Sequence, residues 1–189
     1  MKKLLSIPMF VTASVLLLSS CKKSSDDNAG GGNSAANLGA GKAGITLNTS
    51  ADFAGSTSFS VINTATTSAI NLGGSSLRNI SLSAIGLSGV NTRTVMITII
   101  CPIDANTNSG SLTADLSLPN NATILPTVTL SSTNMSTPGP QYSSADQSGT
   151  MVITKLTNSE IEGTFSGTVK DVNGTTTMTV SNGTFAGKF

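Results

Sequence analysis

The sequence predicts an all-β fold, either a single antiparallel β-sandwich or a flattened barrel, that follows a disordered N-terminal tether. Three observations favour this class: apolar and polar residues alternate in many segments after residue 44, no window has a helical period, and Gly, Asn and Pro separate the segments. Such alternation is typical of antiparallel sheets with one face in solvent. Residues 45–189 are enough for one domain with its own core.

Residues 1–20 have the parts of a bacterial export signal. Lys2 and Lys3 form a basic start, residues 4–18 form a short apolar segment, and Ser19 and Ser20 are small enough for a peptidase cleft. Because a membrane-spanning helix needs ~20 apolar residues, we interpret the segment as a cleaved signal rather than a span.

The run Leu18-Ser19-Ser20-Cys21 resembles the lipobox of bacterial lipoproteins. The resemblance implies that the Cys21 thiol receives a diacylglycerol, that the chain is cut before Cys21, and that the new amine is acylated. The membrane would then be the first partner of the protein, since each buried methylene of the acyl chains contributes ~0.8 kcal/mol. The alternative is an ordinary secretory signal with an incidental cysteine.

Residues 21–44 contain almost no bulky apolar side chain and are expected to form the tether. As a Gly/Ser-like coil this segment would span roughly 25 Å. Its start, Cys21-Lys22-Lys23-Ser24-Ser25-Asp26-Asp27, resembles the stretch after the lipidated cysteine in surface lipoproteins of Bacteroidetes-type bacteria. That resemblance implies a lipid anchor in the outer membrane of the cell envelope and exposure on its outer face. The alternative is that Asp26 and Asp27 only solvate the linker.

The first half of the β-domain is expected to contain strands at residues 44–49, 56–63, 79–87 and 94–101. In the second of these Phe59 and Val61 share the inward face, as Ile80 and Leu82 do in the third. Cys101 ends an apolar run and is expected to be a small buried side chain. The sequence has no histidine to activate its thiol. With Cys21 lipidated, no disulfide is possible within one mature chain.

The second half is expected to contain strands at residues 111–118, 127–131, 150–156, 160–170 and 175–189. The inward faces are Leu112, Ala114 and Leu116, and later Ile161, Phe165 and Val169. The last three strands are expected to form a meander.

Two turns and a bulge shape this meander. Residues 157–159 should form one turn, and Asn173-Gly174 should form a tight hairpin with positive φ. Phe185 lies on the opposite parity from Val180, so Asn182-Gly183 should insert a bulge that restores its inward direction.

The end of the chain carries a second resemblance. Gly163-Thr164-Phe165-Ser166 and Asn182-Gly183-Thr184-Phe185 resemble adjacent strands at the end of a group of small Bacteroidetes-type lipoproteins of unknown function. The resemblance implies a shared β-domain, and it carries no activity with it.

Charge excludes nucleic acid as a partner. Removing Lys2 and Lys3 with the signal leaves eight of the ten basic residues against nine acidic ones, a net charge near minus one. Binding to phosphates requires a clustered basic footprint, which this chain lacks.

A calcium loop is one interpretation of the segment from Asp104 to Asp115. Its Asp and Asn residues approach the oxygen-ligand spacing of such a loop, but its glycine, Gly110, falls one position late and its flanks are expected to be strands. A hairpin loop rich in Asp and Asn explains the same residues. We therefore predict no metal site and no cofactor.

Catalysis is also not expected. Glu160 and Glu162 share one face of a strand, whereas paired catalytic carboxylates usually face each other across a cleft beside aromatic platforms. The chain has no Trp and only one Tyr, Tyr142. We interpret the two glutamates as an exposed strand edge that discourages sheet stacking.

The sequence thus favours a non-catalytic, lipid-anchored envelope protein whose β-domain binds a companion envelope protein or a surface macromolecule. We expect the contact at residues 119–147, a long proline-bearing loop with Tyr142 as its one large amphipathic side chain. The alternative is a lipocalin-like carrier of a small hydrophobic ligand, which needs a closed barrel with an interior cavity of ~300 Å³ or more.

Overall fold

The fold was analysed in a computed structural model that describes residues 33–50, 55–59, 62–88, 91–117, 123–134 and 137–189. The all-β prediction is confirmed, because one antiparallel sheet curls into a half-barrel and the described residues form no α-helix. Cys21 and the signal before it lie outside the described residues, as does Val61. Within the described part, no helix has the length and apolarity needed to cross a bilayer.

Eleven strands and one short 3₁₀ turn make up the described elements. They are η1 (Ala35–Asn37), β1 (Lys42–Thr49), β2 (Gly55–Ser58), β3 (Ile62–Leu72), β4 (Ser75–Ser88), β5 (Asn91–Pro102), β6 (Leu112–Asp115), β7 (Leu125–Asn134), β8 (Thr137–Ser143), β9 (Gly149–Leu156), β10 (Glu160–Asp171) and β11 (Thr177–Lys188). The main path across the sheet is β2-β1-β11-β10-β8-β7-β5-β4-β3, and β9 joins one end of β10 to β6.

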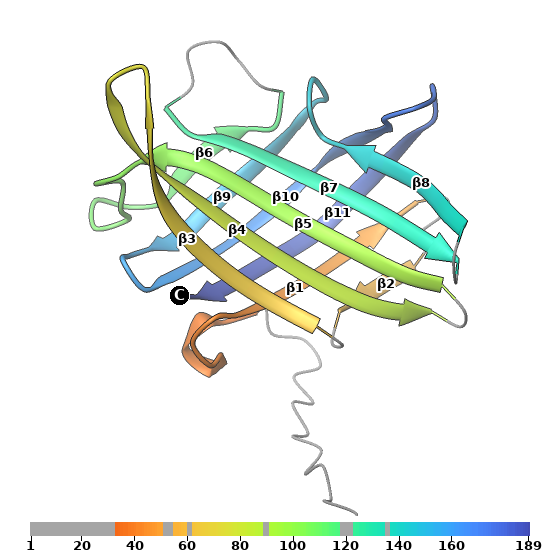
Figure 1. The fold of residues 1–189 in the computed structure, drawn as a ribbon, viewed down its shortest axis with the longest axis horizontal. Helices are drawn as coiled ribbons and strands as arrows, with labels where there is room; N and C mark the ends of the chain where they lie inside the picture. Colours follow the sequence, from red (N-terminus) through yellow and green to blue (C-terminus); the bar gives the residue numbers. More distant parts are fainter. Residues whose placement is uncertain (1–32, 51–54, 60–61, 89–90, 118–122, 135–136) are drawn as a thin grey trace, which may run out of the picture. The chain divides into compact units, whose positions relative to one another are not determined.

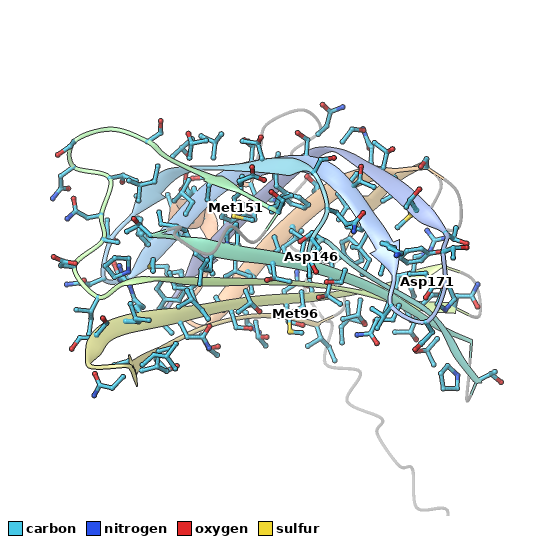
Figure 2. The ribbon with its side chains drawn as sticks, turned by 90° about the horizontal axis from the view of Figure 1, so that it is seen from above. Met96, Asp146, Met151 and Asp171 are labelled. Carbon is cyan, nitrogen blue, oxygen red and sulfur yellow. The ribbon has the colours of Figure 1, made fainter. Side chains whose placement is uncertain are left out.

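The sheet bends so that β3, β4, β5 and β7 lie across from β1, β9, β10 and β11 (Figure 1). Apolar residues at alternate positions of both layers fill the space between them, as the sequence predicts for Ile80, Leu82, Ile161 and Phe165. Viewed from above, Met151 lies between the layers and Met96 lies on the outer side (Figure 2). The core is therefore the concave side of the half-barrel.

The two ends of the sheet approach each other without forming a continuous ladder. The Ala65 amide donates to the Gly41 carbonyl over 3.0 Å, which joins β3 to the residue before β1. Beyond Ala65 the strand β3 pairs with β4 alone, and their hairpin extends past the body of the sheet (Figure 1).

The predicted meander of β9, β10 and β11 is confirmed, and so is the bulge. The register between β10 and β11 shifts between Phe165 and Gly167, where Asn182 has φ of 50°. This extra residue turns Phe185 inward, where it is fully buried and its ring centroid lies 6.3 Å from that of Phe165.

The turn between β10 and β11 differs from the prediction. Neither Asn173 nor Gly174 has a positive φ, because the Asp171 carboxylate accepts the Asn173 amide and thereby stabilises a wider turn. The tight hairpin with two positive φ values occurs instead at Gly73 and Gly74, between β3 and β4.

The prediction that residues 119–147 form a long loop is wrong, because most of the described residues in this range belong to strands. Residues 137–143 form β8, which pairs with β7 and with the end of β10, and Tyr142 is only 1% exposed. Tyr142 is a core residue opposite Leu130, so it is not available as a surface contact. The predicted strand at 56–63 is likewise replaced by β2 and the start of β3.

The folded unit begins earlier than the boundary predicted at residue 45. Its described part covers residues from 33 to 189, and residues 33–38, here called the strap, pack on the outer side of β10 and β11. Residues 33–44 of the predicted tether therefore belong to the β-domain.

Candidate functional site

The strap is seated by polar contacts on the outer face of three neighbouring strands. Asn33 donates from Nδ2 to the Thr184 hydroxyl of β11 over 3.1 Å. The Glu162 carboxylate of β10 accepts the Ser34 hydroxyl at 3.1 Å and the Ala35 amide at 2.7 Å. Since a charged acceptor strengthens such bonds, Glu162 is the main attachment of the strap.

Small residues make room for the strap. Asn33 lies so close to Gly44 of β1 that a Cβ on this glycine would be 3.0 Å from its side-chain oxygen. Ala35 and Ala186 are fully buried, although Ala186 is on the outward parity of β11. The chain thus enters the folded unit at a fixed place on this face.

An ion-pair cluster lies beside the strap. Lys155 Nζ is 2.6 Å from Glu160 Oε2 and 4.0 Å from Glu162 Oε1, and Lys188 Nζ is 3.7 Å from Glu160 Oε1. The hydrogen bond between Glu160 and Lys155 lowers the pKa of the carboxyl and raises the pKa of the ammonium. The prediction that the two glutamates form an exposed strand edge is therefore wrong, because β10 is an interior strand and both side chains have partners.

A hollow of about 410 Å³ lies further along the same face. It is lined by Thr150 and Val152 of β9, by Thr164, Phe165 and Ser166 of β10, and by Asn182, Gly183 and Thr184 of β11. Asn182, the bulge residue, is part of this lining. The lining offers hydroxyl and amide groups and no ionisable side chain, so the hollow can bind a polar neutral group but supplies no general acid or base.

A second hollow of about 240 Å³ lies at the β3–β4 hairpin, lined by Thr67, Ser68, Ala69, Arg78, Ile103 and Asn158. Arg78 is only 6% exposed, and its guanidinium donates to the Thr157 carbonyl at 2.9 Å and the Ala105 carbonyl at 2.7 Å. These bonds hold the β9–β10 turn and the loop after β5 against β4. Arg78 was not singled out from the sequence, although a charge on the inward parity of Ile80 and Leu82 is a visible signal.

Cys101 lies opposite Arg78 in the β4–β5 ladder and is buried with a free thiol. Burial raises the pKa of the Cys101 thiol, and the neighbouring Arg78 charge offsets part of that rise. The thiol is therefore held in its neutral form, as expected for a core cysteine.

Two side chains of the segment from Asp104 to Asp115, those of Asn106 and Asp115, bond within their own turns. Asn106 accepts the Asn108 amide, and the Asp115 carboxylate accepts the amide and hydroxyl of Ser117, which lowers the pKa of Asp115. Among the described residues, no group of three Asp, Glu, His or Cys side chains is placed to hold a metal ion.

Comparison of the chain with models of protein families, with curated proteins and with solved structures found no match. The chemistry of the site is therefore interpreted from its own residues.

Proposed function

We propose that the protein is a lipid-anchored lipoprotein of the bacterial outer membrane whose β-domain is a non-catalytic binding module for a companion envelope protein or a surface macromolecule. The observation that carries this proposal is the strap. Glu162 fixes the chain at Ser34 and Ala35, so a tether from Cys21 leaves the domain at one defined point. A fixed exit point suits a module that presents a particular surface away from its anchor.

The chemistry of the described side chains favours binding over catalysis. The ionisable groups near the strap are engaged in ion pairs, and the Cys101 thiol is buried with a raised pKa. The hollow at Asn182 offers only hydroxyl, amide and apolar groups. We place the partner contact at this hollow, because Tyr142 and its strand β8 are part of the sheet.

A carrier function has no comparable support among the described residues. The hollow of about 240 Å³ is smaller than the roughly 300 Å³ at which ligand pockets begin. The larger hollow opens on the outer face rather than inside the half-barrel, and polar and apolar groups contribute about equally to its lining.

The lipid anchor is tested by feeding producing cells a clickable palmitate analogue. We expect label on the full chain, loss of label and release from the membrane fraction in Cys21→Ala, and retention of both in Cys101→Ala. Label or membrane association that persists in Cys21→Ala would contradict the proposal.

The contact at the hollow is tested with a photo-crosslinking amino acid at Ser166, in the hollow, or at Thr168, further along the same strand face. We expect one discrete adduct from Ser166 in whole cells and little from Thr168. Equal adducts at the two positions would show that the hollow is not the contact.

A further inference from the structure

The outer face of β3, β4, β5 and β7 carries no charge. The only charged residues in these four strands are Arg78 and Arg93, and both lie on the parity of the core positions. Figure 1 views the sheet from this side, and no described element crosses over it. Ile62 and Met96 are 56% and 41% exposed on this face, and Met96 points away from the core (Figure 2).

The strand registers arrange the outward residues of this face in rows. Four rows cross all four strands: Ile62, Ile85, Thr94 and Ser131; Thr64, Ser83, Met96 and Thr129; Thr66, Ser81, Thr98 and Thr127; and Ser68, Asn79, Ile100 and Leu125. A fifth row, with Ile70, Leu77 and Pro102, crosses three of them. The third row is made only of threonine and serine.

In β3 and β4 the residue pattern is nearly symmetric about this hydroxyl row. Along β3 the outward residues read Ile, Thr, Thr, Ser, Ile, and along β4 they read Ile, Ser, Ser, Asn, Leu. Along β5, Met96 and Ile100 stand at equal distances on either side of Thr98. Two strands depart from the pattern: β7 has Thr129 opposite in position to Leu125, and β5 has Thr94 opposite in position to Pro102.

Such a pattern matches a two-fold axis. When two copies of a face meet about an axis that runs along the third row, each residue of that row faces itself and the first row faces the fifth row of the other copy, so that Ile62 faces Ile70 and Ile85 faces Leu77. Met96 then faces Ile100. A charged or asymmetric partner would gain nothing from this symmetry.

The size of the face is also suitable. With strands about 4.8 Å apart and side chains of one face repeating every ~6.8 Å, four strands and five rows cover roughly 600 Å² in projection. A stable interface buries about 800 Å² of accessible surface on each partner. The accessible surface of a patch is larger than its projected area, so the two figures are of similar size. Because the face is the convex side of the half-barrel, its central rows make the contact, and the face supplies part of a standard dimer interface.

We propose that this uncharged face pairs with the same face of a second copy, sheet on sheet, about a two-fold axis along Thr66, Ser81, Thr98 and Thr127. Sheets packed face to face lie ~10 Å apart, which small hydroxyl side chains along the axis accommodate. The pairing does not depend on the lipid anchor or on the hollow at Asn182, which lies on the opposite layer of the sheet.

The test is crosslinking of the full chain in whole cells with a bismaleimide whose spacer is about 10 Å, the separation of packed sheets. Thr98→Cys should give a covalent homodimer. The matched control is Thr179→Cys, an exposed outward threonine of β11 outside the hollow, which should give only the background of the unsubstituted chain. No dimer from Thr98→Cys, an equal dimer from Thr179→Cys, or an adduct of Thr98→Cys with a different protein would overturn the proposal.

A charge test distinguishes self-pairing from every other partner. Thr98→Asp and Thr98→Lys each place like charges opposite each other on the axis, so each variant alone should lose the dimer. Two differently tagged chains, one with each substitution, should recover it when they are produced together. Failure of the mixed pair to copurify, with both variants retaining the melting temperature of the unsubstituted chain, would contradict the two-fold arrangement.

Discussion

Glycines in the meander set how closely side chains pack against the strands. A Cβ on Gly163 would collide with the Val152 carbonyl and with the Phe185 ring, and neither can move without disturbing the ladder or the core. We therefore expect Gly163→Ala to lower the free energy of unfolding by about 1–3 kcal/mol, as overpacking does elsewhere.

The control is Gly39→Ala, because the nearest atom to its added Cβ would be Lys42 Cγ at an ordinary 3.8 Å. Urea unfolding followed by circular dichroism measures both variants. Equal stability of the two would show that the ring of Phe185 adapts.

Because of Cys101, the free energy of unfolding changes with pH in the alkaline range. Its pKa is raised in the folded state mainly because the thiol is buried, so the unfolded state loses the proton first. The stabilising contribution is complete below the unfolded thiol pKa of about 8.5 and is lost as the pH rises through the folded value.

We expect the free energy of unfolding to fall more steeply above about pH 8.5 in the unsubstituted chain than in Cys101→Ala. Denaturant titrations at a series of alkaline pH values measure the difference between the two chains. Parallel pH profiles would exclude this role of the thiol.

At the scale of elements, the strap is held chiefly by one carboxylate. Removing it in Glu162→Ala should free the Ala35 amide, which then exchanges its hydrogen faster, while Glu162→Gln keeps a neutral acceptor and should have an intermediate effect. Thr164→Ala, the next outward residue of β10, should leave exchange at Ala35 unchanged. Unaltered exchange in Glu162→Ala would mean that packing of Ala35 alone seats the strap.

Elements with strong alternation could be predicted from the sequence, and weakly patterned ones could not. β5, β9 and β10 lie close to their expected ranges because their apolar residues occur at every second position. β8 was missed because Pro138, Gly139 and Pro140 argue against a strand. β8 tolerates them since its pairing with β10 involves only two residues of each strand.

The candidate site was less predictable than the fold because its contacts are distant in sequence. Glu162 and Ala35 are 127 positions apart, and nothing in the composition of residues 33–38 indicates a docking segment. The symmetry of the outward residues about the hydroxyl row becomes visible only when the register aligns β3, β4 and β5. By contrast, Cys101 and the bulge at Asn182 follow from local parity, and both are confirmed.

At the scale of the whole molecule, an incompletely closed sheet implies a gradient of stability. β5 and β10 are paired on both sides, whereas β3 beyond Ala65 is paired with β4 alone. We expect the amides of residues 66–72 to exchange with solvent faster than those of β5 and β10. Hydrogen exchange resolved by peptide measures this, and uniform protection across the sheet would imply that the edge of β3 is covered.

The strap also determines the length of the predicted tether. With residues 33–44 in the folded unit, the predicted tether shortens to residues 21–32, whose span as a coil is roughly 19 Å. In the proposed lipid-anchored form, so short a tether confines every copy to one thin layer above the membrane. Confinement of this kind raises the effective concentration of the uncharged face, so two copies could pair there even if their affinity in dilute solution were weak.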